Sequence, residues 1–263
     1  MKIGASSACF YPLETEKSFE KLCNMGFDTV ELFVNSPSEI QDDFLSLLLE
    51  IRNKYGVNII SIHPFSSFAE TGLFFSTYER RFLDALPFYD AFLRAAGILG
   101  AKYFVVHGCR SVVGFDDEEY FRRFKILCET GRKYGVSVCQ ENVVQFKSQS
   151  PQFLLKMREY LQDEFKMVFD IKQAYRSGYT YSDFFEPLHE SIVHLHLSDH
   201  NEKSDCIVPM SGNFPYNQFF SDIKRFNIKA DCVIEVYEWS YTDESEITAS
   251  RASLETVAGK ILF

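Results

Sequence analysis

Six residues with acid, base or metal-binding side chains stand at the ends of six successive apolar runs. The runs read NIISIH, KYFVVH, VSVCQE, KMVFD, SIVHLH and DCVIE, and their residue types favour β-strands. Turn or polar residues follow each run. If the runs are parallel strands, their terminal side chains meet at one rim. These side chains are His63, His107, Glu141, Asp170, His196 and Glu235.

The last four runs supply a candidate metal site made of Glu141, Asp170, His196 and Glu235. A carboxylate that ends an apolar strand is costly to bury unless something pairs with it, because removing an anion from water costs several kcal/mol. Three carboxylates and one imidazole, without a thiolate, suit Mn²⁺, Mg²⁺, Co²⁺ or Zn²⁺ rather than a structural zinc site. The alternative is four unconnected polar residues, each bonded to a nearby loop.

The two earlier histidines, His63 and His107, allow several kinds of chemistry. As neutral imidazoles they could bind substrate hydroxyls, hold a water molecule or ligate a second metal. The alternative is that they bond to a neighbouring carboxylate such as Glu31. His194 shares a strand face with His196, since side chains two apart point the same way, and we expect it to be a hydrogen-bonded core residue rather than a ligand.

Strand-like and helical segments alternate eight times along the 263 residues. This size and period predict an α/β fold, a (β/α)8 TIM barrel, as a single domain over residues 1–263, with its active site at the carboxyl ends of the strands. The runner-up is a doubly wound sheet, but its usual GxGxxG turn is missing after the first strand, where SSACFYPLE stands. The predicted strands are 2–8, 28–33, 57–63, 102–107, 136–141, 166–170, 191–198 and 231–236, and the predicted helices are 14–25, 37–55, 76–99, 116–134, 150–162, 181–189, 214–226 and 243–260.

Composition excludes several classes of protein. The net charge of −10 repels phosphate backbones, so nucleic acid is not an expected partner. Apolar runs are far shorter than the roughly 20 residues that span a bilayer, and the start lacks the features of a secretory signal, so a cytoplasmic protein is expected. Seven cysteines without CxxC pairing indicate reduced core residues. The 27 phenylalanines imply a bulky core and are compatible with a homo-oligomer.

The order and spacing of several segments resemble the xylose-isomerase-like barrel superfamily, and within it the sugar phosphate isomerase/epimerase branch, which is related to endonuclease IV-type enzymes. This resemblance implies that Glu141, Asp170, His196 and Glu235 bind one divalent cation. It further implies that Glu141 and Glu235 double as acid–base groups. The segments that carry it are GFDTVELF (26–33), the strand ends at His63 and His107, QEN (140–142), FDIKQA (169–174), HLHLSD (194–199) and IEVYE (234–238).

Two departures from the family pattern narrow the expected chemistry. Family members often have histidine three residues after the strand-6 aspartate, where this chain has Gln173, so a substrate contact is expected there without a titrating role. Endonuclease IV-type enzymes bind further metals through an Asp-x-His pair after strand 7, whereas SDCIVPMSGNF contains no histidine. A trinuclear phosphodiesterase site is therefore not expected.

We therefore expect a metal-dependent isomerase or epimerase acting on a sugar, a sugar phosphate or another keto-polyol. Glu141 and Glu235 would transfer protons through an enediolate that the cation stabilises. The candidate substrate-binding residues are His63, His107, Gln173, Lys172, Arg110 and Trp239, and the candidate aromatic walls are Phe10, Phe33, Phe65, Tyr237 and Trp239.

Three alternatives remain open on the sequence. A keto-inositol dehydratase-type lyase would use the same metal and enolate chemistry. An endonuclease IV-like DNA-repair nuclease is disfavoured by the acidic charge and the missing loop histidine. A non-catalytic sugar-binding barrel would not need three carboxylates at the rim.

Overall fold

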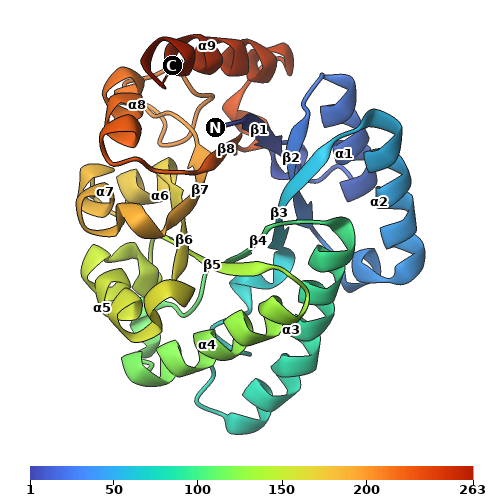
Figure 1. Ribbon diagram of the computed structural model, residues 1–263, viewed down its shortest axis with the longest axis vertical. Coiled ribbons are helices and arrows are strands. Elements are labelled where there is room, and N and C mark those ends of the chain that lie inside the picture. Colours follow the sequence, from blue (N-terminus) through green and yellow to red (C-terminus); the bar gives the residue numbers. More distant parts are fainter. Residues whose placement is uncertain (263) are drawn as a thin grey trace.

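Eight parallel strands close into a barrel in the order β1 to β8, and β8 pairs back onto β1. The computed structural model describes residues 1–262, apart from the side chains of residues 67 and 68. Figure 1 looks along the barrel and shows the helices as an outer ring. The predicted TIM barrel is confirmed. The strands are β1 (Ile3–Ser6), β2 (Thr29–Val34), β3 (Asn58–Pro64), β4 (Tyr103–Val106), β5 (Ser137–Glu141), β6 (Lys166–Asp170), β7 (Ile192–Leu197) and β8 (Asp231–Ile234).

Each predicted helix overlaps an observed one, and one short helix, α6, follows β6 without having been predicted. The α-helices are α1 (Thr15–Asn24), α2 (Asp42–Tyr55), α3 (Glu79–Leu99), α4 (Asp117–Lys133), α5 (Pro151–Leu161), α6 (Ile171–Arg176), α7 (Ser182–Leu188), α8 (Tyr216–Arg225) and α9 (Ser245–Leu262). Short 3-10 helices occupy the connections: η1 (Ser7–Phe10), η2 (Pro37–Ile40), η3 (Phe65–Phe68), η4 (Ser111–Val113), η5 (Lys147–Gln149), η6 (Gln162–Glu164), η7 (His189–Ser191) and η8 (Glu238–Ser240).

The apolar core has two parts. The larger one lies between strands and helices and contains most of the buried phenylalanines. A smaller cluster, formed by Val105, Cys139 and Val168, fills the inside of the barrel. Because strand residues two apart share a face, Cys139 and Val168 place Glu141 and Asp170 directly above this floor. All seven cysteines are buried free thiols, as expected.

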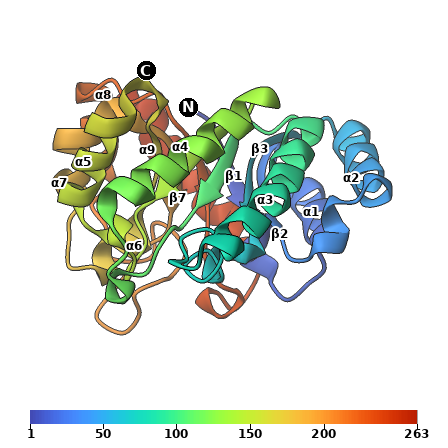
Figure 2. The same ribbon diagram turned by 90° about the horizontal axis from the view of Figure 1, so that it is seen from below.

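The two ends of the barrel differ in their connections. In Figure 2 both termini lie at the upper end, and long loops gather at the lower end, beyond the carboxyl ends of the strands. This lower end carries the candidate chemistry. Within residues 1–262, none of the helices combines the length and the apolar character that a membrane crossing needs.

Arg123 on α4 holds the long connection between β3 and α3. Its guanidinium is buried and donates hydrogen bonds to the carbonyls of Phe74 (2.8 Å) and Ser76 (2.9 Å). The same group pairs with Glu119 one turn earlier on α4, at 2.5 Å. Since a buried guanidinium needs a counterion, Glu119 contributes to the contacts by which Arg123 holds this loop beside the barrel mouth.

Glu119 should make the stability of the fold depend on pH. Hydrogen bonds from Arg122 lower the pKa of the Glu119 carboxyl to about 2. Partial burial opposes this lowering, and hydrogen bonds from Arg123 reinforce it. A lowered pKa contributes stability above the ordinary value of about 4.5, and this contribution is lost as pH falls toward about 2. Glu119→Gln should therefore lower the free energy of unfolding near neutral pH by about 1–2 kcal/mol, discounted for partial exposure.

Urea unfolding across a pH series measures this effect. The difference between wild type and Glu119→Gln should shrink as the solution is acidified below about pH 4.5. Glu129→Gln, a change at an exposed position of the same helix, is the matched control and should change little. A difference that stays constant with pH would contradict the assignment.

Candidate active site

His196 is the centre of the charged cluster at the barrel mouth. Its Nδ1 lies 3.3 Å from Glu141 Oε1, 3.6 Å from Asp170 Oδ2 and 3.3 Å from Glu235 Oε2. Its Nε2 lies 3.1 Å from Glu31 Oε2 on the other side of the ring. The ends of β5, β6, β7 and β8 thus bring together the four residues that the sequence nominated as metal ligands, with ligand atoms within 4.8 Å of one another.

Glu31 on β2 orients this histidine from below. Its Oε2 also accepts a hydrogen bond from Ser61 Oγ (2.7 Å) and lies 3.5 Å from His194 Nε2. Metal-binding histidines commonly donate their second N–H to a carboxylate, which fixes the ring. His194 in turn contacts the carbonyl of Asp231 at 3.0 Å through Nδ1, so it is the hydrogen-bonded core residue that its position on β7 predicted.

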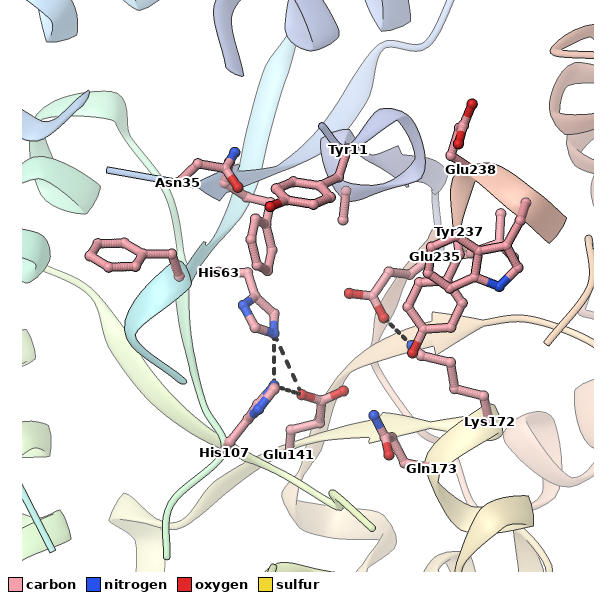
Figure 3. A pocket seen from close by; sticks show the side chains of 15 residues that line it. Tyr11, Asn35, His63, His107, Glu141, Lys172, Gln173, Glu235, Tyr237 and Glu238 are labelled. Atoms are coloured by element: carbon pink, nitrogen blue, oxygen red, sulfur yellow. Dashed lines mark hydrogen bonds and ion pairs between the residues drawn. The ribbon is translucent and has the colours of Figure 1, made fainter. Parts of the chain in front are cut away.

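His63 and His107 gather around Glu141 rather than Glu31, the neighbour considered in the sequence. The two Nε2 atoms lie 3.0 Å apart, and Glu141 Oε2 is 2.8 Å from His107 and 3.6 Å from His63. Figure 3 shows the three side chains pointing toward one another. His63, His107 and Glu141 form a second group able to hold a cation. Glu141 belongs to this group and to the group around His196, because it ends β5, the strand that pairs with β4.

Lys172 brings a positive charge into the first group. It lies two residues after Asp170, and its Nζ contacts both Asp170 Oδ2 and Glu235 Oε2. Its side chain is only 4% exposed. Figure 3 shows it reaching toward Glu235 beneath Tyr237. Sequence reasoning assigned Lys172 to substrate, but its ammonium is engaged by two candidate metal ligands.

Glu141 and Glu235, the two glutamates among the four candidate ligands, both have lowered pKa values. Burial alone would raise the pKa of Glu141, but the charge of His107 and hydrogen bonds from the surrounding histidines hold it well below its usual range. Burial also opposes ionisation of Glu235, and the charges of Lys172 and His196 outweigh it, so its pKa is lowered too. Both side chains are therefore available as proton acceptors.

The pKa values of Asp170 and Lys172 are both raised, for different reasons. Burial raises the pKa of Asp170, and the neighbouring Glu141 and Glu235 add to this, against the opposing charge of Lys172. Burial would lower the pKa of Lys172, but Asp170 and Glu235 raise it well above its usual range. The raised pKa keeps the Lys172 ammonium positively charged.

The residues on either side of Glu141 hold the strand ends in place. Gln140 Nε2 donates to the carbonyl of His107 at 2.9 Å. Asn142 brackets Asp170: its Nδ2 donates to the Asp170 carbonyl at 3.0 Å, and its Oδ1 accepts from the Asp170 N–H at 2.7 Å. Sequence reasoning noted QEN only as a motif. The alternation of side chains along a strand, which points residues 140 and 142 away from the face of Glu141, could have indicated that these two residues support the strand ends.

A buried glutamate that the sequence did not single out fixes the turn after His107. Glu70 accepts a hydrogen bond from the Gly108 N–H, and burial raises its pKa well above the usual range. Gly108 has a φ of 93°, and a Cβ there would lie 1.8 Å from the Tyr120 hydroxyl oxygen. That hydroxyl donates to Gln140 Oε1 at 2.5 Å. The turn therefore requires glycine.

A cavity of about 570 Å³ lies above the cluster. Glu141 and Glu235 line it, while Asp170 and His196 lie beneath its surface. Among the candidate substrate-binding residues, Arg110 does not line it, because its guanidinium turns to Gln145 Oε1 (2.5 Å). The candidates that do line it are His63, His107, Lys172, Gln173 and Trp239.

Aromatic side chains wall much of the cavity. Phe33, Phe65 and Tyr11 line it. Tyr237 and Trp239 line it as well, stacked with ring centroids 4.6 Å apart and 13° between planes. Of the predicted wall residues, Phe10 alone does not line the cavity. It is buried in the main apolar core.

Known proteins share this architecture. The xylose isomerase-like TIM barrel family matches residues 19–257. The uncharacterized protein MJ1311 of Methanocaldococcus jannaschii is 27% identical over 251 residues, which cover 90% of this chain and 83% of that protein.

Solved structures superpose over nearly the whole chain. A D-tagatose 3-epimerase-like protein has a TM-score of 0.81 at 21% identity, covering 99% of this chain and 98% of its own. The D-psicose 3-epimerase of Clostridium cellulolyticum H10 has a TM-score of 0.79 at 15% identity, covering 100% and 99%. An IolI protein with a bound zinc atom has a TM-score of 0.80 at 16% identity, covering 99% of each chain. These likenesses establish a common fold.

Replacing Asn142 should loosen the end of β6. Asn142→Ala removes both partners of the buried Asp170 backbone, so the free energy of unfolding should fall by roughly 1–3 kcal/mol, the usual cost of leaving buried polar groups unpaired. Urea denaturation followed by circular dichroism measures the loss. Asn53→Ala, at an exposed position on α2, is the control. Equal stability of the two variants would contradict the bracketing role.

Proposed function

The chain belongs to the xylose isomerase-like TIM barrel family, and on that premise we propose that it is a divalent-metal-dependent isomerase or epimerase of a sugar, a sugar phosphate or another keto-polyol. The observation that carries this proposal is the convergence of Glu141, Asp170, His196 and Glu235 at the floor of the cavity. The ketose epimerases among the similar structures support the choice of substrate class.

The donor set fits a divalent cation. Three carboxylates face one imidazole nitrogen, and Glu31 holds the opposite nitrogen of that ring. Oxygen-rich sites with one nitrogen suit Mn²⁺, Mg²⁺, Co²⁺ or Zn²⁺. When bound, the cation would supply Lewis acidity toward a substrate carbonyl and its neighbouring hydroxyl.

Glu141 and Glu235 are the proposed acid–base pair because they alone among the four candidate ligands line the cavity. One of them accepts the proton from the carbon next to the carbonyl, leaving an enediolate. The other returns a proton to the opposite face for epimerisation, or to the neighbouring carbon for isomerisation. The lowered pKa values of both residues keep them ready to accept a proton near neutral pH.

The remaining lining residues would bind and orient the substrate. His63 and His107 offer ring nitrogens to hydroxyl groups, and Gln173 offers an amide whose Oε1 already accepts from the Val144 N–H at 3.2 Å. Trp239, which is 74% exposed at the rim, gives an apolar face for a sugar ring. Aromatic walls with a few placed polar groups are typical of small-ligand sites.

The metal proposal predicts a loss of bound metal in two variants. Asp170→Ala and His196→Ala should bind less than stoichiometric Mn²⁺ after loading and dialysis, because each removes a ligand. Elemental analysis measures the metal, and circular dichroism checks the fold. His189→Ala changes a histidine before β7, at the other end of the barrel, and should keep the metal. Full occupancy in both ligand variants would refute the four-residue site.

The acid–base proposal predicts solvent exchange that depends on either glutamate. The wild-type protein loaded with Mn²⁺ should exchange deuterium from solvent into the carbon next to the carbonyl of an accepted ketose, measured by NMR. Glu141→Gln and Glu235→Gln remove the base but keep an oxygen donor, so turnover should fall roughly 10²-fold or more with metal retained.

Glu190→Gln, again before β7, serves as the matched control and should exchange normally. The substrate panel comprises ketoses, ketose phosphates and keto-inositols. If the wild type exchanges no proton across this panel and instead cuts abasic DNA, the isomerase proposal fails and the nuclease reading replaces it.

A further inference from the structure

Lys172 occupies an unusual place for a lysine. It is the second residue of α6, and its ammonium reaches back under the cavity floor to Asp170 and Glu235. The side chain is 4% exposed. A buried ammonium is stabilised only by close counterions, and here both counterions belong to the proposed metal site.

The ammonium uses the same oxygen atoms that a metal would need. Asp170 Oδ2 and Glu235 Oε2 contact Lys172 Nζ. These two atoms also face His196 Nδ1, at 3.6 and 3.3 Å, beside Glu141 Oε1 at 3.3 Å. A divalent cation between the imidazole and these carboxylates would therefore meet the ammonium, and like charges so close in a buried site repel strongly.

The surroundings of Lys172 provide a place for it to move. Lys172 is itself one of the residues that line the cavity, and its Nζ lies 5.9 Å from the centre of the Tyr237 ring. Tyr237 is held by a hydrogen bond from Arg176 Nη1 (2.9 Å), and Arg176 pairs with Asp205 through both of its other nitrogens, at 2.7 and 3.0 Å. A flexible lysine stem beside a fixed aromatic face can rotate upward without moving α6.

We propose that Lys172 is an internal cation that competes with the divalent metal for Asp170 and Glu235. In the metal-free protein it neutralises these carboxylates. When the metal binds, the ammonium is displaced into the cavity beside Tyr237, where it faces an anionic or oxygen-rich group of the substrate. The inference rests on the proposed metal site. It implies that the Lys172 ammonium enters the cavity only when the metal binds.

The first experiment removes the competitor. Lys172→Met keeps an unbranched side chain, one atom shorter, and deletes its charge. The affinity for Mn²⁺ measured by isothermal titration calorimetry should therefore rise roughly tenfold or more, because changes at residues that contact metal ligands typically alter metal affinity by this amount. Lys147→Met is the matched control: Lys147 is a half-buried lysine paired with Asp117, so the net charge changes equally. An affinity of Lys172→Met equal to or weaker than that of wild type overturns the proposal.

The second experiment uses the wild-type protein, so it does not depend on whether the variant folds. Reductive methylation followed by peptide mass spectrometry reports the accessibility of each lysine. Saturating Mn²⁺ should increase the methylation of Lys172 several-fold while Lys147 stays constant. Unchanged methylation of Lys172 in a protein that demonstrably binds Mn²⁺ overturns the inference and leaves the proposed function intact.

Metal binding by these variants tests both proposals, whereas methylation tests the displacement alone. If wild type and Lys147→Met bind no metal but Lys172→Met does, Lys172 occupies the site permanently, and both its displacement by metal and the metal-dependent function are refuted. If neither wild type nor Lys172→Met binds metal, both proposals fall. A melting temperature of metal-free Lys172→Met below that of wild type, restored by Mn²⁺, would further support the role of Lys172 as counterion.

Discussion

Buried carboxylates can stand together only when buried positive charge or hydrogen-bond donors stand with them, and this constraint organises the whole barrel mouth. Glu31 lies within β2, Glu141 and Asp170 end β5 and β6, and Glu235 directly follows β8; all four are buried. Without partners, each would cost several kcal/mol to desolvate. Imidazoles on β3, directly after β4 and on β7, together with one ammonium on α6, supply the compensating positive charge and hydrogen-bond donors.

Residues on the two faces of each strand have different roles, because side chains alternate along a strand. Inward residues such as Glu141 carry the charge, whereas the outward Gln140 and Asn142 bind neighbouring backbone. Beyond them, Glu70 fixes the turn at Gly108 and Arg123 fixes the loop that carries Glu70. The positions of the candidate site residues therefore depend on supporting contacts in three successive layers, as functional sites generally do.

The fold and the cluster could be predicted because both follow from strong periodic signals. Apolar strand-like runs located all eight strands, and the six runs that end in histidine, aspartate or glutamate brought Glu141, Asp170 and His196 to one rim. Weaker signals failed. The predicted helix 37–55 divides into η2 and α2, and six-residue α6 is too short to show a helical period. The pairing of Lys172 with Glu235 joins residues 63 positions apart, and the turning of Arg110 toward Gln145 depends on loop conformation, so neither left a local pattern.

The aromatic rim has a consequence for how this barrel could acquire new specificities. Tyr11 and Trp239 are 57% and 74% exposed, stand on loops and lie outside the ion-paired cluster. Substitutions at exposed positions outside such pairs usually change stability by only about 0.5 kcal/mol, so these two rim positions should tolerate change. A combinatorial library confined to Tyr11 and Trp239 would therefore vary the shape of the cavity mouth while the buried ion pairs beneath it stay unchanged.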